Sequence, residues 1–215
     1  MSRSFADIGK ELSAKRVLVD GGVMSALLGA IVMVSLAYDA EMWHQDYPPD
    51  IQERAGPMSE RAKRERLVVA VPLFAILFGA PVLSNLKLKG ERGGELSFAA
   101  AAANAYAVWL VFNLFDLLVL DYLILIGLNP RFAVLAGTEG MPSYRDFRFP
   151  FLGFLKGLVV GLIPSLLIAL LTMRKQPPRR GCLMGFRYPT TLLLVSAMSG
   201  LVLLRMASCL FPQDR

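Results

Sequence analysis

The residues best able to do chemistry lie in one long apolar run, Leu96–Leu128, which carries two acids. On an α-helix with Asn113 at zero, Asp116 falls at about −60° and Asp121 at about +80°. The amide then lies between two carboxylates that are ~140° apart, which is too far for a close pair on one helix. Carboxylates within a hydrophobic span usually line a cavity or an ion pathway. Alternatively, both acids lie at the level of the lipid headgroups, because the uncharged part of the run is already long enough to cross a membrane.

Two loops beside this run add further candidate residues. His44, Asp46 and Tyr47 lie in the loop after the first apolar run, whereas Glu139 and Asp146 lie in the loop after the long run. If successive runs cross a membrane in alternation, both loops emerge on the same side as Asp121. We therefore predict that these groups converge with the two acids at one membrane face. The alternatives are that the acids are solvated helix ends and that His44 belongs to an interfacial aromatic belt.

The chemistry open to these side chains is limited. His44 and Asp46 could act as a base and its orienting partner, or could bind a metal ion with a third ligand such as Glu139. The chain has a single histidine and two cysteines, which excludes a multi-histidine site within one chain and a cysteine cluster. No nucleotide-binding loop or hydrolase nucleophile motif is present. We expect no metal and no cofactor.

Long apolar runs dominate the rest of the sequence. Hydrophobic residues make up 55% of the 215 residues and charged residues 19%. A membrane-spanning helix needs about 20 mostly apolar residues, and a lipid environment leaves no water to satisfy a bare backbone. The sequence therefore predicts an all-α membrane protein, a bundle of four to five transmembrane helices in a single domain of residues 1–215. The predicted spans cover about 17–38, 67–86, 97–126, 150–173 and 188–208.

The fourth run carries a packing signal. Gly153, Gly157 and Gly161 recur every four residues, so they share one helix face and permit close approach of a second helix. The alanine-rich start of the long run offers a similarly smooth surface, which predicts direct contact between these two helices. Lys156 lies near the start of the same run. It can either extend to the headgroups or pair with an acid inside the bundle.

The net charge of +6 fits contact with anionic lipid. We therefore expect the lipid bilayer as the main partner and no nucleic acid, since no nucleic-acid-binding motif is present. The glycine face makes a partner membrane protein or a homo-oligomer the candidate protein contact. Lys and Arg divide almost equally between the two sides, so the orientation is not assigned.

Several short motifs resemble an uncharacterised family of small bacterial polytopic membrane proteins with four helices, described as permease-like. They are Asp46-Tyr47-Pro48, Phe115-Asp116 through Asp121, Arg131-Phe132, Gly137-Thr138-Glu139, Tyr144, and Phe149 through Gly153-Phe154-Leu155-Lys156-Gly157. The resemblance covers Tyr47 to Leu171 and implies a multi-pass protein of the bacterial cytoplasmic (inner) membrane. It brings no established activity. The chain departs from the family pattern at Pro150, where members carry a histidine.

These observations lead to one main functional hypothesis and two alternatives. The main hypothesis is a small permease-like or transporter-associated protein, in which Asp116 and Asp121 face a polar path. The first alternative is a membrane-embedded enzyme for a lipid or lipid-linked substrate that uses His44, Asp46, Glu139 and Asp146. The second is a structural helix bundle that binds a partner membrane protein.

Overall fold

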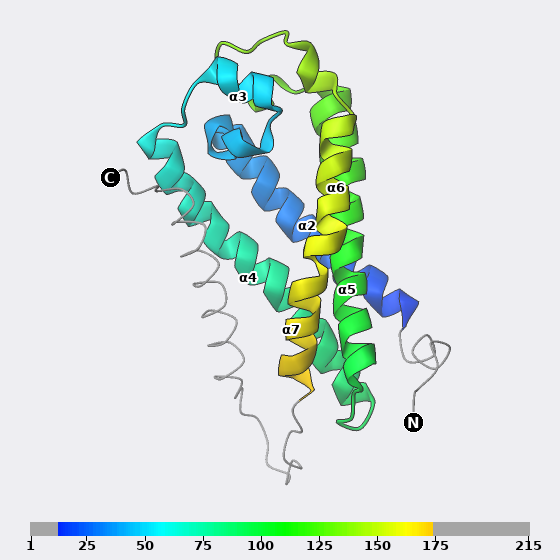
Figure 1. Cartoon of the computed structure of the whole chain (residues 1–215). Coiled ribbons are helices and arrows are strands. Elements are labelled where there is room, and N and C mark those ends of the chain that lie inside the picture. Colours follow the sequence, from blue (N-terminus) through cyan, green and yellow to red (C-terminus); the bar gives the residue numbers. More distant parts are fainter. Residues whose placement is uncertain (1–12, 174–215) are drawn as a thin grey trace.

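The computed structural model describes residues 13–173, and every regular element in that range is helical (Figure 1). Its helices include four stretches long and apolar enough to cross a membrane: Ala14–Tyr38, Glu60–Glu91, Phe98–Leu128 and Arg148–Thr172. The predicted all-α fold is therefore confirmed, and the first four predicted spans each have a matching helix. The predicted fifth span, 188–208, lies outside the described residues.

Serine caps set the starts of the second and third spans. In helix α4 (Glu60–Glu91), the Ser59 hydroxyl accepts a hydrogen bond from the Ala62 N–H at 3.2 Å. Helix α5 (Phe98–Phe115) begins in the same way, after Ser97. Such caps satisfy a backbone donor that has no partner within the helix. The second span therefore starts well before its apolar run, and the basic segment 61–66 is part of the helix.

The third span changes its helical geometry halfway along. Directly after α5, the segment η2 (Asp116–Leu128) is a π-helix, in which N–H groups bond to carbonyls five residues back rather than four. It ends at Asn129, whose φ of 42° is left-handed and whose N–H still reaches the Ile124 carbonyl at 3.1 Å. Pro130 follows and cannot extend the ladder because it has no N–H. The acidic half of the span is therefore wound differently from the rest.

The remaining elements complete the first and fourth spans and the loops. Helix α2 (Ala14–Tyr38) forms the first span, and α6 (Arg148–Val160) and α7 (Leu162–Thr172) form the fourth, meeting at Gly161. The first loop contains η1 (Ala40–Asp46) and α3 (Pro49–Ala55), and the third contains η3 (Arg131–Ala133) and η4 (Pro142–Arg145). Both loops lie at the upper end of the molecule in Figure 1.

Small residues let the first and third spans approach closely. A methyl group added at Gly21 of α2 would lie 2.6 Å from the Cβ of Val111 in α5, which is too close for any real contact. Nearby, Met24, Leu28 and Val108 form a fully buried cluster between the same two helices. The packing of α2 on α5 therefore depends on a residue without a side chain at this point.

The fourth span packs on the third through two of the three predicted glycines. A methyl group at Gly157 would overlap the Asn113 amide, and one at Gly161 would overlap the Trp109 indole. Gly153 has no heavy atom within 4 Å of such a methyl group. These glycines therefore meet polar side chains of α5 rather than its alanine-rich start.

Side-chain donors reinforce this helix pair. Tyr106, Trp109 and Asn113 donate hydrogen bonds to carbonyls of the fourth span, at 3.0, 3.2 and 3.1 Å. The accepting carbonyls belong to Leu158, Gly157 and Phe154. Part of the polar face predicted on the third helix is thus used to hold the fourth helix in place.

A buried amide network joins three helices near the other end of the bundle. Asn104 of α5 donates to Ser84 Oγ and Asn85 Oδ1 of α4, both at 2.9 Å. Asn85 in turn donates to the Ala101 carbonyl at 3.0 Å and to the Thr172 hydroxyl of α7 at 3.2 Å. Both asparagines are fully buried. Buried amides of this kind fix the register of the helices, because a shift would leave them without partners.

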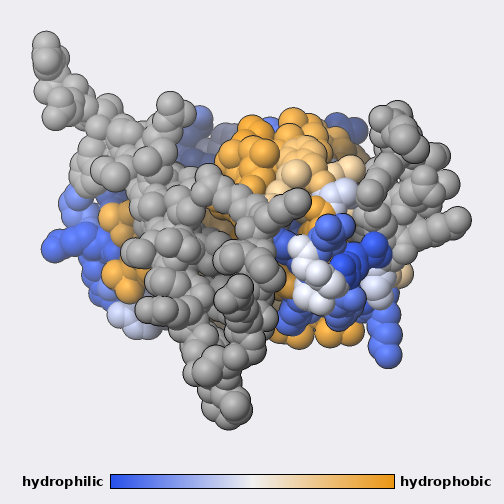
Figure 2. Space-filling view, turned by 90° about the horizontal axis from the view of Figure 1, so that it is seen from below, coloured by the Kyte–Doolittle hydropathy of each residue, from blue (hydrophilic) through white to orange (hydrophobic). Residues whose placement is uncertain are grey.

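Large apolar side chains also cover the outside of the bundle. Val34, Val68, Val159 and Ile163 each expose about two thirds of their surface, although they lie on the long helices. The view from below in Figure 2 shows hydrophobic residues at the periphery on more than one side. A water-soluble protein rarely carries such a surface. The chain is therefore built as a multi-pass integral membrane protein.

Candidate functional site

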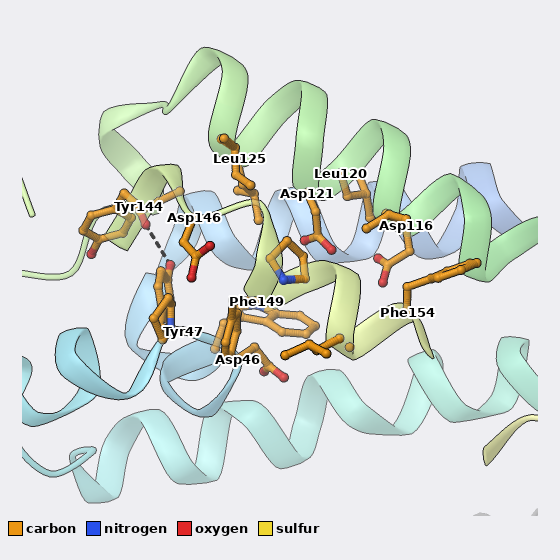
Figure 3. Close-up of a pocket in the computed structure, with 18 of the residues that line it drawn as sticks. Asp46, Tyr47, Asp116, Leu120, Asp121, Leu125, Tyr144, Asp146, Phe149 and Phe154 are labelled. Atoms are coloured by element: carbon orange, nitrogen blue, oxygen red, sulfur yellow. Dashed lines mark hydrogen bonds between the residues drawn. The ribbon is translucent and has the colours of Figure 1, made fainter. Parts of the chain in front are cut away.

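A cavity of about 430 Å³ lies at the end of the bundle that carries the first and third loops (Figure 3). Its walls come from α2, η1, the end of α5, η2, η3, η4 and α6. Four carboxylates line it, from Asp46, Asp116, Asp121 and Asp146. Asn113, Tyr47 and Lys156 line it as well. The structure thus brings six of the eight candidate binding residues named from the sequence into one space.

The π-helix explains how both acids of the third span reach this cavity. Residues five apart lie nearly above one another when the backbone bonds five residues back. Asp116, Asp121 and Ile126 follow this spacing, and all three line the cavity. Leu118 and Leu123, also five apart, are outward-facing. The angle of ~140° expected between the two acids was wrong because it assumed 100° per residue.

Asp116 and Asp121 have no partner of opposite charge. Neither carboxylate forms an ion pair or a side-chain hydrogen bond with another residue of the segment 13–173. The two carboxylates and that of Asp46 are near enough to repel one another electrostatically. Figure 3 shows both carboxyl groups pointing from η2 towards α6. The protein therefore gives these two acids no direct partner of its own within the described segment.

The other two carboxylates each have a partner. Asp46 Oδ2 lies 3.6 Å from Arg66 Nη2, and Asp146 Oδ1 accepts a hydrogen bond from the Arg148 N–H at 2.8 Å. Loss of bulk water around the Asp46 carboxyl raises its pKa above the ordinary value, and Arg66 acts in the opposite direction. Asp46 and Asp146 thus lie at the loop end of the cavity, with cationic or donor groups beside them.

Two tyrosines tie the first loop to the third above the cavity. Tyr47 donates a hydrogen bond to the Ala133 carbonyl at 2.8 Å, and its ring meets Tyr144 edge to face at 6.0 Å. Burial, Tyr144 and Asp46 raise the pKa of the Tyr47 hydroxyl, so it remains a donor. Tyr144 accepts from the Leu135 N–H at 3.0 Å. The two loops therefore act as one cover, as expected if they emerge on the same side.

No family model, no curated protein and no solved structure matches the chain.

The family resemblance, the bacterial origin and the assignment to the inner membrane therefore stay predictions.

The structure separates the residues that were named for an enzyme. His44 lines a second cavity of about 540 Å³ together with Asp39, Glu41 and Arg131. Glu139 lines neither cavity, and its carboxylate accepts from the Gly137 N–H at 3.2 Å. Of the four residues named for an enzyme, only Asp46 and Asp146 line the first, acidic cavity.

The carboxylates are arranged around the space rather than gathered at one point. Within residues 13–173, no three His, Cys, Asp or Glu side chains are grouped so that they could hold a metal ion. His44 and Asp46 do not share a cavity, so the base and orienting partner suggested by their spacing do not meet there. The geometry suits binding of a positively charged group by several dispersed carboxylates.

Sequence reasoning missed the aromatic side of the cavity. Phe149 and Phe154 of α6 line it, and both are labelled in Figure 3, with Phe154 beside Asp116. Their spacing of five residues carries no helical periodicity signal that would have marked them. Lys156, which had two alternative placements, lines the cavity and forms no ion pair within the described segment. The buried pair Asn85 and Asn104 was also missed, although an amide inside an uncharged span is itself a signal.

Proposed function

We propose that this protein is a small permease-like membrane protein in which the acidic cavity forms part of a path for a solute. The observation that carries the proposal is the pair Asp116 and Asp121, two carboxylates without protein partners in one cavity of a membrane-spanning bundle. A charged side chain at the centre of a hydrophobic span costs about 2.5–3.5 kcal/mol on insertion scales. Acids kept in such spans usually serve a pathway.

The loop cover supports a gate at one end of this path. Besides the Tyr47 contact, Arg54 Nε donates to the Gly137 carbonyl at 3.4 Å, and the Ser143 hydroxyl contacts the Asp50 carboxylate. These contacts are few, polar and at the surface, so each contributes little to stability. A cover held in this way can open without disturbing the helix packing below it.

Solute flux in proteoliposomes tests the proposal. Vesicles would contain the full chain, and the solutes would be protons, K⁺ and labelled tetraethylammonium. We expect flux of at least one of them to fall roughly tenfold or more in Asp116→Asn and Asp121→Asn, as for loss of a charged contact. Glu53→Gln, an exposed acid of α3 outside the cavity, is the matched control and should behave as the unchanged protein. Equal flux in all four proteins would contradict the proposal.

A further inference from the structure

We propose that the cavity binds an organic cation with an apolar body, and that Asp116 and Asp121 hold the charge while Phe149 and Phe154 hold the body. This inference rests on the proposed function, since it names the class of solute for the same cavity. Figure 3 shows the two carboxyl groups projecting from η2 towards α6, which carries Phe149 and Phe154, with Phe154 beside Asp116.

The charge of the ligand follows from what lines the cavity. Four acidic residues line it, against one basic residue, Lys156. Asp116 is half-buried, and it lines the cavity. An isolated carboxylate in a low-dielectric interior is unfavourable unless a positive charge or hydrogen-bond donors approach it. Because the described protein supplies none to Asp116 or Asp121, a cationic guest gains the most from this position.

The apolar body follows from the apolar side chains that line the same space. Leu120 and Leu125 of η2 and Leu152 of α6 line the space beside the two phenyl rings. A cation within about 6 Å of an aromatic ring is attracted to its face, and the attraction grows when water is excluded. The volume of about 430 Å³ lies within the range of small-molecule pockets, ~300–1,000 Å³. The cavity therefore has room and apolar surface that a bare ion does not use.

The arrangement of the acids argues against an inorganic divalent cation as the guest. Ca²⁺ takes about 6–8 oxygen ligands at short range, so its acids converge on one point. Within residues 13–173, no three acidic side chains are close enough for this. Carboxylates spread around a larger space instead match the diffuse charge of a substituted ammonium or phosphonium group.

Substitution of Lys156 is expected to change binding in the direction opposite to substitution of the acids. Lys156 lines the same cavity, and its positive charge repels a cationic guest bound there. Removing it should strengthen binding, whereas removing either acid should weaken binding. Loss of folding weakens binding in every variant, so it cannot produce changes in both directions.

Equilibrium dialysis of the purified full chain in lipid nanodiscs measures the binding. The probe is labelled tetraphenylphosphonium, and tetraphenylborate, which has the same shape and the opposite charge, is the control ligand. Empty nanodiscs correct for partition into lipid. We expect saturable phosphonium binding that weakens roughly tenfold or more in Asp116→Asn and Asp121→Asn. Binding should weaken about threefold to tenfold in Phe149→Ala and Phe154→Ala. It should strengthen in Lys156→Met, and tetraphenylborate should show no saturable binding.

The results separate this inference from the proposed function. Phosphonium binding that no acid variant changes, or borate binding of equal strength, overturns the inference. Proton or K⁺ flux that requires Asp116, without phosphonium binding, overturns the inference and leaves the permease proposal standing. Phosphonium binding with the expected variant pattern but without any flux supports the inference and contradicts the permease proposal.

Discussion

At the scale of single residues, the absence of a side chain decides how the third and fourth spans meet. In Gly157→Ala the new methyl group would overlap the Asn113 amide, which also donates to the Phe154 carbonyl. We expect a loss of about 1–3 kcal/mol, the usual cost of overpacking a well-packed contact. The measurement is the free energy of unfolding in detergent, or the shift of the thermal transition at fixed detergent concentration.

Gly153→Ala is the matched control for this substitution. It lies one helical turn earlier on the same helix, and a methyl group there meets no atom within 4 Å. Because alanine favours a helix over glycine by up to about 1 kcal/mol, we expect equal or greater stability. Equal destabilisation by both substitutions would show that the predicted glycine contact does not form at Gly157.

At the scale of elements, the π-helix determines which side chains of η2 face the cavity. In an α-helix, position 123 would share the face of Asp116, seven residues earlier. In the observed geometry, positions 116, 121 and 126 line the cavity and positions 118 and 123 face outward. The two geometries therefore predict different patterns of access to water along the same thirteen residues.

Cysteine substitution along η2 distinguishes these patterns. Single cysteines would be placed at Asp116, Leu118, Asp121, Leu123 and Ile126, in a chain whose Cys182 and Cys209 are replaced by serine. We expect a charged, membrane-impermeant thiol reagent to label positions 116, 121 and 126 at least several times faster than 118 and 123, because thiols in lipid do not ionise readily. Fast labelling at 123 with slow labelling at 121 would show an α-helical segment and contradict the π-helical site.

The same segment shows how far the sequence could predict the site. Apolar runs of more than twenty residues predict helices because a membrane leaves the backbone no other partner, so the fold followed directly. The expectation that the first and third loops lie at the same end of the bundle followed from counting spans. The pairing of Asp116 with Asp121 could not be predicted, since nothing in their sequence shows that the backbone bonds five residues back. The position of Phe149 and Phe154 depends on the packing of α6 against η2, which only the three-dimensional arrangement shows.

At the scale of the whole molecule, the two ends of the bundle differ in construction. Near one end, Asn85 and Asn104 join α4, α5 and α7 through buried hydrogen bonds. At the other end, a few polar contacts between two loops close a cavity in which Asp116 and Asp121 have no protein partner. One rigid end and one loosely covered end fit the proposed gate, in which the loop cover opens and closes at one membrane face.

This arrangement predicts that the first and third loops lie on the same side of the membrane and the second loop on the other. Glu53 and Glu139 are exposed positions in the first and third loops, and Glu95 is an exposed position in the second. In the cysteine-free chain, we expect an impermeant maleimide applied to sealed vesicles to label Glu53→Cys and Glu139→Cys alike. Glu95→Cys should be labelled only when the reagent reaches the opposite face, and permeabilised vesicles give the full signal for each. Labelling of Glu53→Cys and Glu139→Cys from opposite faces would separate the loops that form the cover, and with them the acidic cavity.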